Sequence, residues 1–207
     1  MGLISNGTTI FDAGALDSGI AKGAMTFIKK LTASTSATLS FVHGASGVVL
    51  DGTYKEYLFT FNNIHPGTNN KRLTFNMSID GGTNYNVLKT STYFYAFNFE
   101  SADNPEVEYN SGSDLAQDAG FQMLTTEIQL DADGCSAGFM HLFNPSSTTF
   151  IKHFIAVTND YQNEDRDYSN YSAGYGNTTS AVNAISFKME SGNIDSGKIK
   201  LYGIKDS

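Results

Sequence analysis

Apolar and polar residues alternate along residues 73–79, which read Leu-Thr-Phe-Asn-Met-Ser-Ile. Successive side chains of a β-strand point to opposite faces of the sheet, so a period of two predicts a strand with one apolar and one polar face. We expect the apolar face to lie in a core and the polar face to lie in solvent.

The segment from residue 141 to residue 154, HLFNPSSTTFIKHF, places two apolar runs on either side of a polar stretch that begins Asn-Pro. This pattern predicts an antiparallel hairpin. In its first strand, Phe139, His141 and Phe143 would share one face, and Met140 and Leu142 the other. Both faces are largely apolar, which is typical of a strand covered on both sides.

Similar runs of apolar, aromatic and β-branched residues recur along the chain between breaks rich in Gly, Asn and Pro. The further predicted strands are 25–31, 37–43, 54–64, 87–99, 121–130, 136–144, 149–159, 168–175, 183–190 and 197–204. Residues 100–120 are acidic or small and predict an exposed loop. About eleven short strands without an amphipathic helix or internal repeat predict an all-β fold, a β-sandwich of jelly-roll type.

The first 22 residues follow neither period and predict an extended N-terminal arm, with a single β-sandwich domain over residues 23–207. Such an arm is either a frayed terminus or a segment that becomes ordered on a neighbouring subunit. Its scattered apolar residues favour the second interpretation and are candidate partner-binding residues. They are Leu3, Ile4, Ile10, Phe11, Leu16 and Ile20.

The composition narrows the classes of partner. The 207-residue chain has a formal net charge of −8 and no dense cluster of Lys and Arg, so binding to nucleic acid or to an anionic membrane is not expected. Only 16% of residues are charged, while Ser, Thr, Asn and Gly make up about 38%. Neutral polar groups therefore carry much of the solubility.

The start of the chain lacks a basic segment followed by an apolar run, and no stretch of about 18 apolar residues occurs. We therefore expect synthesis and folding in a cytoplasm. Cys135 is the single cysteine, which excludes an intrachain disulfide and a zinc site built from paired cysteines.

Candidate metal ligands are weak. His141 and His153 lie on the two arms of the predicted hairpin and could sit nearly opposite each other, but they lack a carboxylate ligand, and we expect packed histidines. Residues 131–134 match only the first part of a calcium loop and predict a turn. Residues 159–167 concentrate oxygen ligands for a weak calcium or magnesium site, and a solvated loop is the favoured alternative.

No catalytic set is evident either. The sequence holds no Gly-x-Ser-x-Gly elbow, no Walker loop and no dinucleotide fingerprint, and Cys135 has no evident histidine partner. We therefore expect a protein that is not an enzyme and that needs no cofactor.

Tyrosines recur among small polar residues from residue 161 to residue 175. Tyr161, Tyr168, Tyr171 and Tyr175 could contact a glycan or a protein partner, because tyrosine supplies rigid amphipathic area. The simpler interpretation is that they fill the edge of the sandwich.

Three segments carry a resemblance: DGTYKEYLFTFNNIHP at 51–66, HLFNPSSTTFIKHF at 141–154 and SGNIDSGKIKLYGI at 191–204. Together with the first 19 residues, they resemble a family of small virion structural proteins of tailed bacteriophages of marine and cyanobacterial type. The resemblance implies a β-rich, multimeric building block on a particle surface and supplies no catalytic or ligand residues.

Two hypotheses follow. The first is a non-enzymatic virion protein that decorates or cements the capsid or forms part of a tail appendage, as a homo-oligomer, with a trimer favoured, and in contact with other virion proteins. The alternative is a carbohydrate-binding module that recognises host-surface glycans through the tyrosines and acidic loop of residues 160–175.

Overall fold

The computed structural model describes residues 2–12, 15–16, 23–101, 105–162 and 165–206, and its regular elements are all strands. They are β1 (Leu3–Ser5), β2 (Thr8–Asp12), β3 (Ala15–Leu16), β4 (Met25–Thr32), β5 (Leu39–Val42), β6 (Glu56–Pro66), β7 (Leu73–Ser78), β8 (Lys89–Phe99), β9 (Glu106–Tyr109), β10 (Ala116–Asp118), β11 (Gln122–Met123), β12 (Ser136–Phe143), β13 (Lys152–Gln162), β14 (Arg166–Gly176), β15 (Ala184–Met189) and β16 (Ile194–Ile204).

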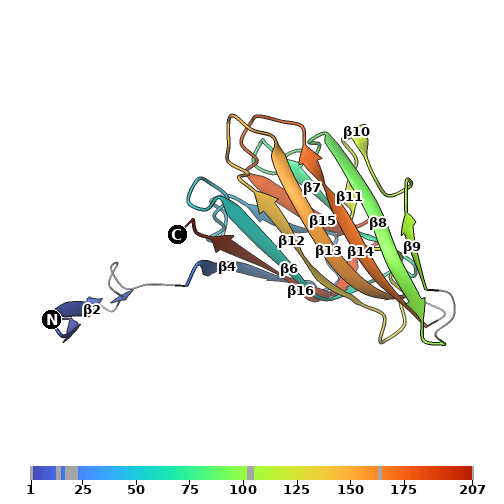
Figure 1. Ribbon diagram of the computed structural model, residues 1–207, viewed down its shortest axis with the longest axis horizontal. Coiled ribbons are helices and arrows are strands. Elements are labelled where there is room, and N and C mark those ends of the chain that lie inside the picture. The colour runs from blue at the N-terminus through green and yellow to red at the C-terminus, as the bar shows by residue number, and fades with distance from the viewer. Residues whose placement is uncertain (1, 13–14, 17–22, 102–104, 163–164, 207) are drawn as a thin grey trace.

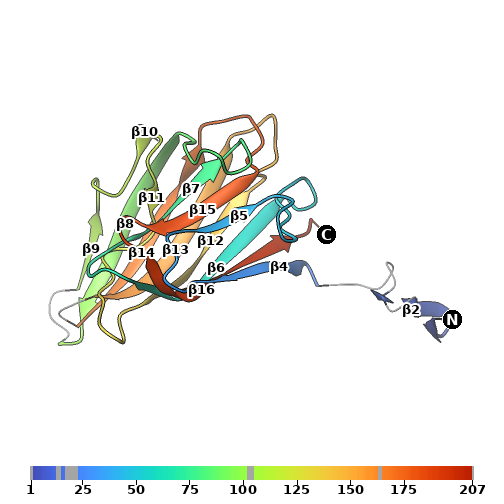
Figure 2. The same ribbon diagram turned by 180° about the vertical axis from the view of Figure 1, so that it is seen from behind.

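Two antiparallel sheets of unequal size face each other. The large sheet has nine strands in the order β10-β8-β14-β13-β12-β6-β16-β4, with β9 also paired to β8, and the small sheet has the order β11-β7-β15-β5. The large sheet lies in front in Figure 1 and the small sheet lies in front in Figure 2. The predicted all-β sandwich is therefore confirmed, while its jelly-roll type stays a prediction.

The first three strands stand apart from this sandwich. β1, β2 and β3 pair only with one another, and both views show them beyond the end of the body, connected to β4. β4 in turn is the last strand of the large sheet and pairs with β16 alone.

The core consists of the inward-facing aromatic and aliphatic side chains of both sheets. The Phe187 ring of β15 has its centroid 5.3 Å from that of Phe59, 5.4 Å from that of Phe61, and 6.3 Å from those of Phe41 and Phe75. All five side chains are at most 1% exposed. Rings from both sheets thus interlock around Phe187.

The expectation of a solvent-exposed polar face at residues 73–79 is wrong, because the polar side chains Thr74, Asn76 and Ser78 of β7 are fully buried. Loops cover this outer face of the small sheet. Asn76 Nδ2 donates hydrogen bonds to the carbonyl oxygens of Tyr85 (2.7 Å) and Ala119 (2.8 Å). The polar side chains of this face therefore form hydrogen bonds with the covering loops and not with water.

The expected loop of residues 100–120 contains two short edge strands, β9 and β10, both paired to β8. Their side chains are exposed, as the acidic composition indicates. The run 121–130 forms only the two-residue β11 and then continues as irregular chain.

Replacing Phe187 by alanine should lower the free energy of unfolding by about 3–5 kcal/mol, because a cavity opens where rings from four strands meet. Phe150→Ala is the matched control: Phe150 is 66% exposed, so its truncation should change stability by less than about 0.5 kcal/mol. Urea unfolding followed by circular dichroism measures both. Equal losses in the two variants would contradict this account of the core.

Candidate functional site

The outer face of the large sheet carries the main candidate surface. On β12, Met140 and Leu142 point into the core, while Phe139, His141 and Phe143 point outward. Phe139 is 38% exposed and the other two are partly exposed. The expectation that protein covers both faces of this strand is therefore wrong within the single chain.

The strand register extends this apolar surface across five strands. Phe27 of β4 pairs with Tyr202 of β16, which pairs with Leu58 of β6. Leu58 pairs in turn with His141 of β12, and His141 pairs with Ile155 of β13. With its neighbours in the adjacent rows, we call this the outer-face patch. It consists of Met25, Phe27, Leu58, Phe139, His141, Phe143, Ile155 and Tyr202.

The outer-face patch is unusually accessible for so apolar a surface. Met25 and Phe27 are each 55% exposed and Ile155 is 48% exposed. Monomeric soluble proteins rarely expose contiguous apolar patches of more than a few hundred Å², and larger patches mark sites of association. No described part of the chain forms a layer over this patch, so its burial requires another molecule.

A histidine–carboxylate contact lies at the patch, and a pair of lysines lies beside it. His141 Nδ1 contacts the carboxylate of Glu56, and both side chains are about three-quarters buried. Lys30 and Lys200 pair across β4 and β16 in the next row. An approaching partner would therefore meet aromatic rings bordered by positive charge.

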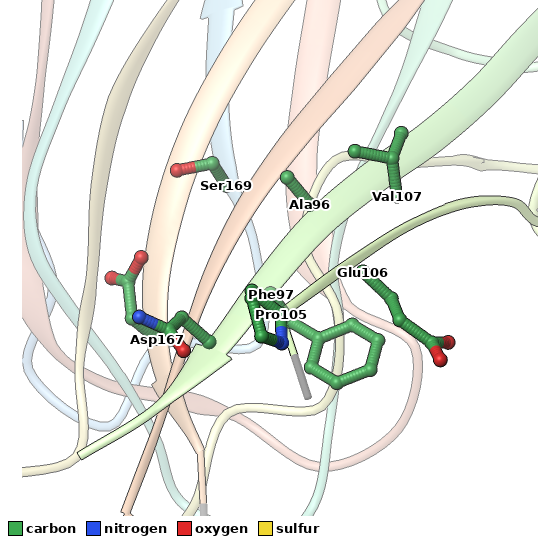
Figure 3. Close-up of a pocket in the computed structure, with 8 residues that line it drawn as sticks. Ala96, Phe97, Pro105, Glu106, Val107, Asp167 and Ser169 are labelled. Carbon is green, nitrogen blue, oxygen red and sulfur yellow. The ribbon is translucent and has the colours of Figure 1, made fainter. Parts of the chain in front are cut away.

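A cavity of about 340 Å³ lies at the far corner of the same face, where β8, β9 and β14 adjoin. Figure 3 shows Asp167 and Ser169 of β14 on one side, Glu106 and Val107 of β9 on the other, and Ala96 of β8 between them. The remaining lining residues are Phe97, Asn98 and Pro105. We call the depression over these strands the corner groove.

The four candidate tyrosines do not form one site. Tyr171 and Tyr175 of β14 and Tyr161 of β13 point to the outer face, whereas Tyr168 points inward, is 7% exposed and stacks on Phe97. Alternation along β14 explains the separation, because Tyr168 differs from Tyr171 and Tyr175 by an odd number of positions.

The candidate arm residues are only partly described. Leu3 and Ile4 of β1 are 61% and 58% exposed, and Ile10 lies in β2. The backbones of Phe11 and Leu16 pair between β2 and β3. Ile20 lies outside the described residues.

The two histidines considered as metal ligands, His141 and His153, do not face each other across the hairpin. The register places His141 opposite Ile155, and His153 opposite Tyr175, so the two histidines are not directly paired. Within the described residues, no group of three or more His, Cys, Asp or Glu side chains is placed to hold a metal ion.

The expectation of a loop over residues 159–167 is wrong at both ends of the run, because Asp160 lies in β13 and Asp167 in β14. Asp160 points into the sandwich, while Asp167 points outward. The Asp160 carboxylate, 1% exposed, accepts hydrogen bonds from the Thr126 hydroxyl and from Asn170 Nδ2. Burial raises the pKa of Asp160 to about 7, and the two hydrogen bonds only partly offset that effect. Tyr93 Oη donates to Asn170 Oδ1 (2.8 Å), which extends the network into β8.

Two lysines, Lys89 and Lys152, are fully buried, and no sequence pattern predicts their burial. Lys89 Nζ donates to Asn76 Oδ1 (2.6 Å) and to the Val87 carbonyl (2.7 Å), and burial lowers the pKa of Lys89 to about 7. Lys152 Nζ donates to the carbonyl oxygens of Ser147 (2.7 Å) and Phe150 (2.5 Å). Because acceptors of the fold bind both Nζ atoms, these lysines are structural.

Comparison of the chain with protein-family models, with curated proteins and with solved structures gave no match. In the described part of the chain, no helix has the length and hydropathy needed to cross a membrane.

The substitution Asp160→Asn should remove a pH-dependent loss of stability. The folded protein holds a proton on Asp160 up to a pKa of about 7, whereas the unfolded carboxyl titrates near 3.8. The unfolding free energy of the unsubstituted protein should therefore fall, relative to the variant, by about 1.4 kcal/mol per pH unit between these values, and stay constant outside them. Urea unfolding at several pH values measures the difference, and a pH-independent difference would contradict it.

Proposed function

We propose that this chain is a non-enzymatic structural protein of a bacteriophage virion, which decorates or cements the capsid or forms part of a tail appendage. It assembles with copies of itself and with other virion proteins, and assembly is its activity. The outer-face patch carries the proposal: five adjacent strands present apolar side chains to a face that the described chain leaves uncovered.

The location of the patch agrees with the resemblance found in the sequence. Residues 51–66, 141–154 and 191–204 contain β6, the end of β12 with the start of β13, and the whole of β16. These strands are neighbours in the large sheet, in the order β13-β12-β6-β16. The segments that resemble virion proteins therefore contribute central residues of the patch, Leu58, His141 and Tyr202.

The detached strands β1–β3 support assembly independently. A two-stranded hairpin is marginally stable by itself in water, and β3 adds only two residues to β1 and β2. The exposed Leu3 and Ile4 of β1 would gain most by packing on a neighbouring subunit, which is how a terminal arm links copies in a closed oligomer. In our proposal the arm and the outer-face patch both become buried in the multimer, with a trimer favoured.

Ile155→Glu tests the patch. A charge within the patch should dissociate the multimer, because a buried unpaired carboxylate costs several kcal/mol at an interface. Sedimentation velocity at micromolar concentration measures the mass. Phe150→Glu, also at an exposed apolar residue but outside the patch, should leave the mass unchanged. A monomeric unsubstituted protein, or a multimer unaffected by Ile155→Glu, would contradict the proposal.

Deleting residues 2–20 tests the arm. We expect incorporation into multimers and particles to be lost while the thermal unfolding of the sandwich stays the same, because β1–β3 pair only with one another. Circular dichroism and sedimentation distinguish the two effects. Full incorporation of the truncated chain would show that the arm has no part in assembly.

A further inference from the structure

The corner groove has the layout of a small binding site. Three rows of outward-facing residues cross β8 and β14: Asn98 pairs with Asp167, Ala96 with Ser169, and Phe94 with Tyr171. Ala96 and Ser169 are small, so the middle row is low, and the cavity of about 340 Å³ lies over it. Cavities of this size fall within the range of small-molecule sites.

A stacked aromatic pair adjoins the groove without lining either cavity. The Phe94 and Tyr171 rings stack with their centroids 4.9 Å apart and their planes at 7°. They remain 40% and 39% exposed and are the next outward-facing residues along each strand, about 7 Å from the middle row. A fixed and accessible pair of rings offers apolar contact to the C–H face of a pyranose, and the Tyr171 hydroxyl adds a polar group.

The groove has a polar wall, formed by Asp167 and Asn98, and hydrogen bonds hold Asp167 in position. Asp167 Oδ1 accepts a hydrogen bond from Asn159 Nδ2 (2.6 Å), which also donates to the Tyr168 carbonyl (3.1 Å). Asn98 stands beside Asp167 and is exposed. An oriented carboxylate next to a carboxamide offers acceptors and donors to neighbouring hydroxyl groups at little entropic cost.

A second cavity, of about 390 Å³, extends the site. It is lined by Asn98, Phe99, Glu100, Tyr161 and Asp167, so it shares Asn98 and Asp167 with the first. The two cavities therefore adjoin along the ends of β8, β14 and β13, and a ligand of more than one ring unit could occupy both.

The charge of the groove restricts the ligand. Asp167, Glu106 and Glu100 line the cavities, and among their described lining residues there is no Lys or Arg. The Arg166 guanidinium lies on the Phe99 ring, 4.2 Å from its centroid, so one cation stands near three carboxylates. The negative balance disfavours phosphorylated, sulfated and sialylated ligands.

We propose that the corner groove binds a neutral saccharide, with Asp167 and Asn98 hydrogen-bonding its hydroxyl groups and Phe94 and Tyr171 packing against its ring. This goes beyond assembly and does not depend on it. The groove lies on β8 and β14, and its lining residue Asp167 pairs with Tyr161 of β13, which is six residues, or about 20 Å, along that strand from Ile155 of the patch. A multimer that buries the outer-face patch can therefore leave the groove open.

The test is a glycan array of neutral and sialylated oligosaccharides probed with the full chain, followed by titration calorimetry with the best neutral binder. Asp167→Ala and Asn98→Ala should each weaken binding at least about tenfold, and Tyr171→Ala should weaken it comparably. Asp206→Ala removes an exposed carboxylate outside the groove and should leave the affinity unchanged. Circular dichroism confirms that each variant is folded.

Three results would overturn the proposal: no neutral glycan bound by the unsubstituted protein, a preference for sialylated glycans, or unchanged affinity in folded Asp167→Ala and Asn98→Ala variants. The variant Ile155→Glu distinguishes this site from the assembly surface, because it should lower the mass of the multimer and leave the saccharide affinity unchanged. Loss of both together would place the ligand at the interface between copies instead of in the groove.

Discussion

Packing of the Phe187 ring against rings of three other strands determines which way every strand of the sandwich faces. Once Phe59 and Phe61 of β6 point toward Phe187, the period of two forces Leu58 to the opposite side, and the strand register carries the same choice to β12, β13 and β16. The outer-face patch and the corner groove are therefore set by the core, although they contain none of its residues.

Residues with ionisable side chains occupy some of the inward-facing positions of the large sheet. Inward positions of β8 and β13 that aromatic or aliphatic residues could fill are occupied by Lys89, Lys152 and Asp160, all at most 1% exposed. Each is bound by carbonyl, amide or hydroxyl groups, so its burial is tolerated. A slip of β13 by one residue would turn Lys152 and Asp160 away from these partners, so the polar groups favour a single register.

The strands of the large sheet could be predicted because their alternation is long and strongly apolar. Whether each face of a strand is buried or exposed could not be predicted from this alternation. Alternation shows that Thr74 and Asn76 share a side, but loops distant in sequence decide that this side is buried. Conversely, the apolar neighbours of Phe139 and His141 predict that both are buried, and only the structure shows that these outward-facing side chains remain partly exposed.

The candidate sites illustrate the same limit. Tyr168 and Tyr171 lie three residues apart and were grouped by composition, yet an odd spacing in a strand places them on opposite faces. Asn98 and Asp167 are 69 positions apart, and only the pairing of β8 with β14 brings them together. The residue types of such a groove can be read from the sequence, but their arrangement depends on the register between strands that are distant in the sequence.

The free edge of β4 has a consequence for behaviour at high concentration. Other terminal strands are short: β10 has three residues, β5 four and β11 two, whereas β4 has eight and an open row of backbone donors and acceptors. Lys29 and Lys30 occupy its middle. Two adjacent ammonium groups repel a second copy of the same strand. They therefore discourage edge-to-edge pairing of sheets from different copies into fibrils, while permitting ordered contacts elsewhere.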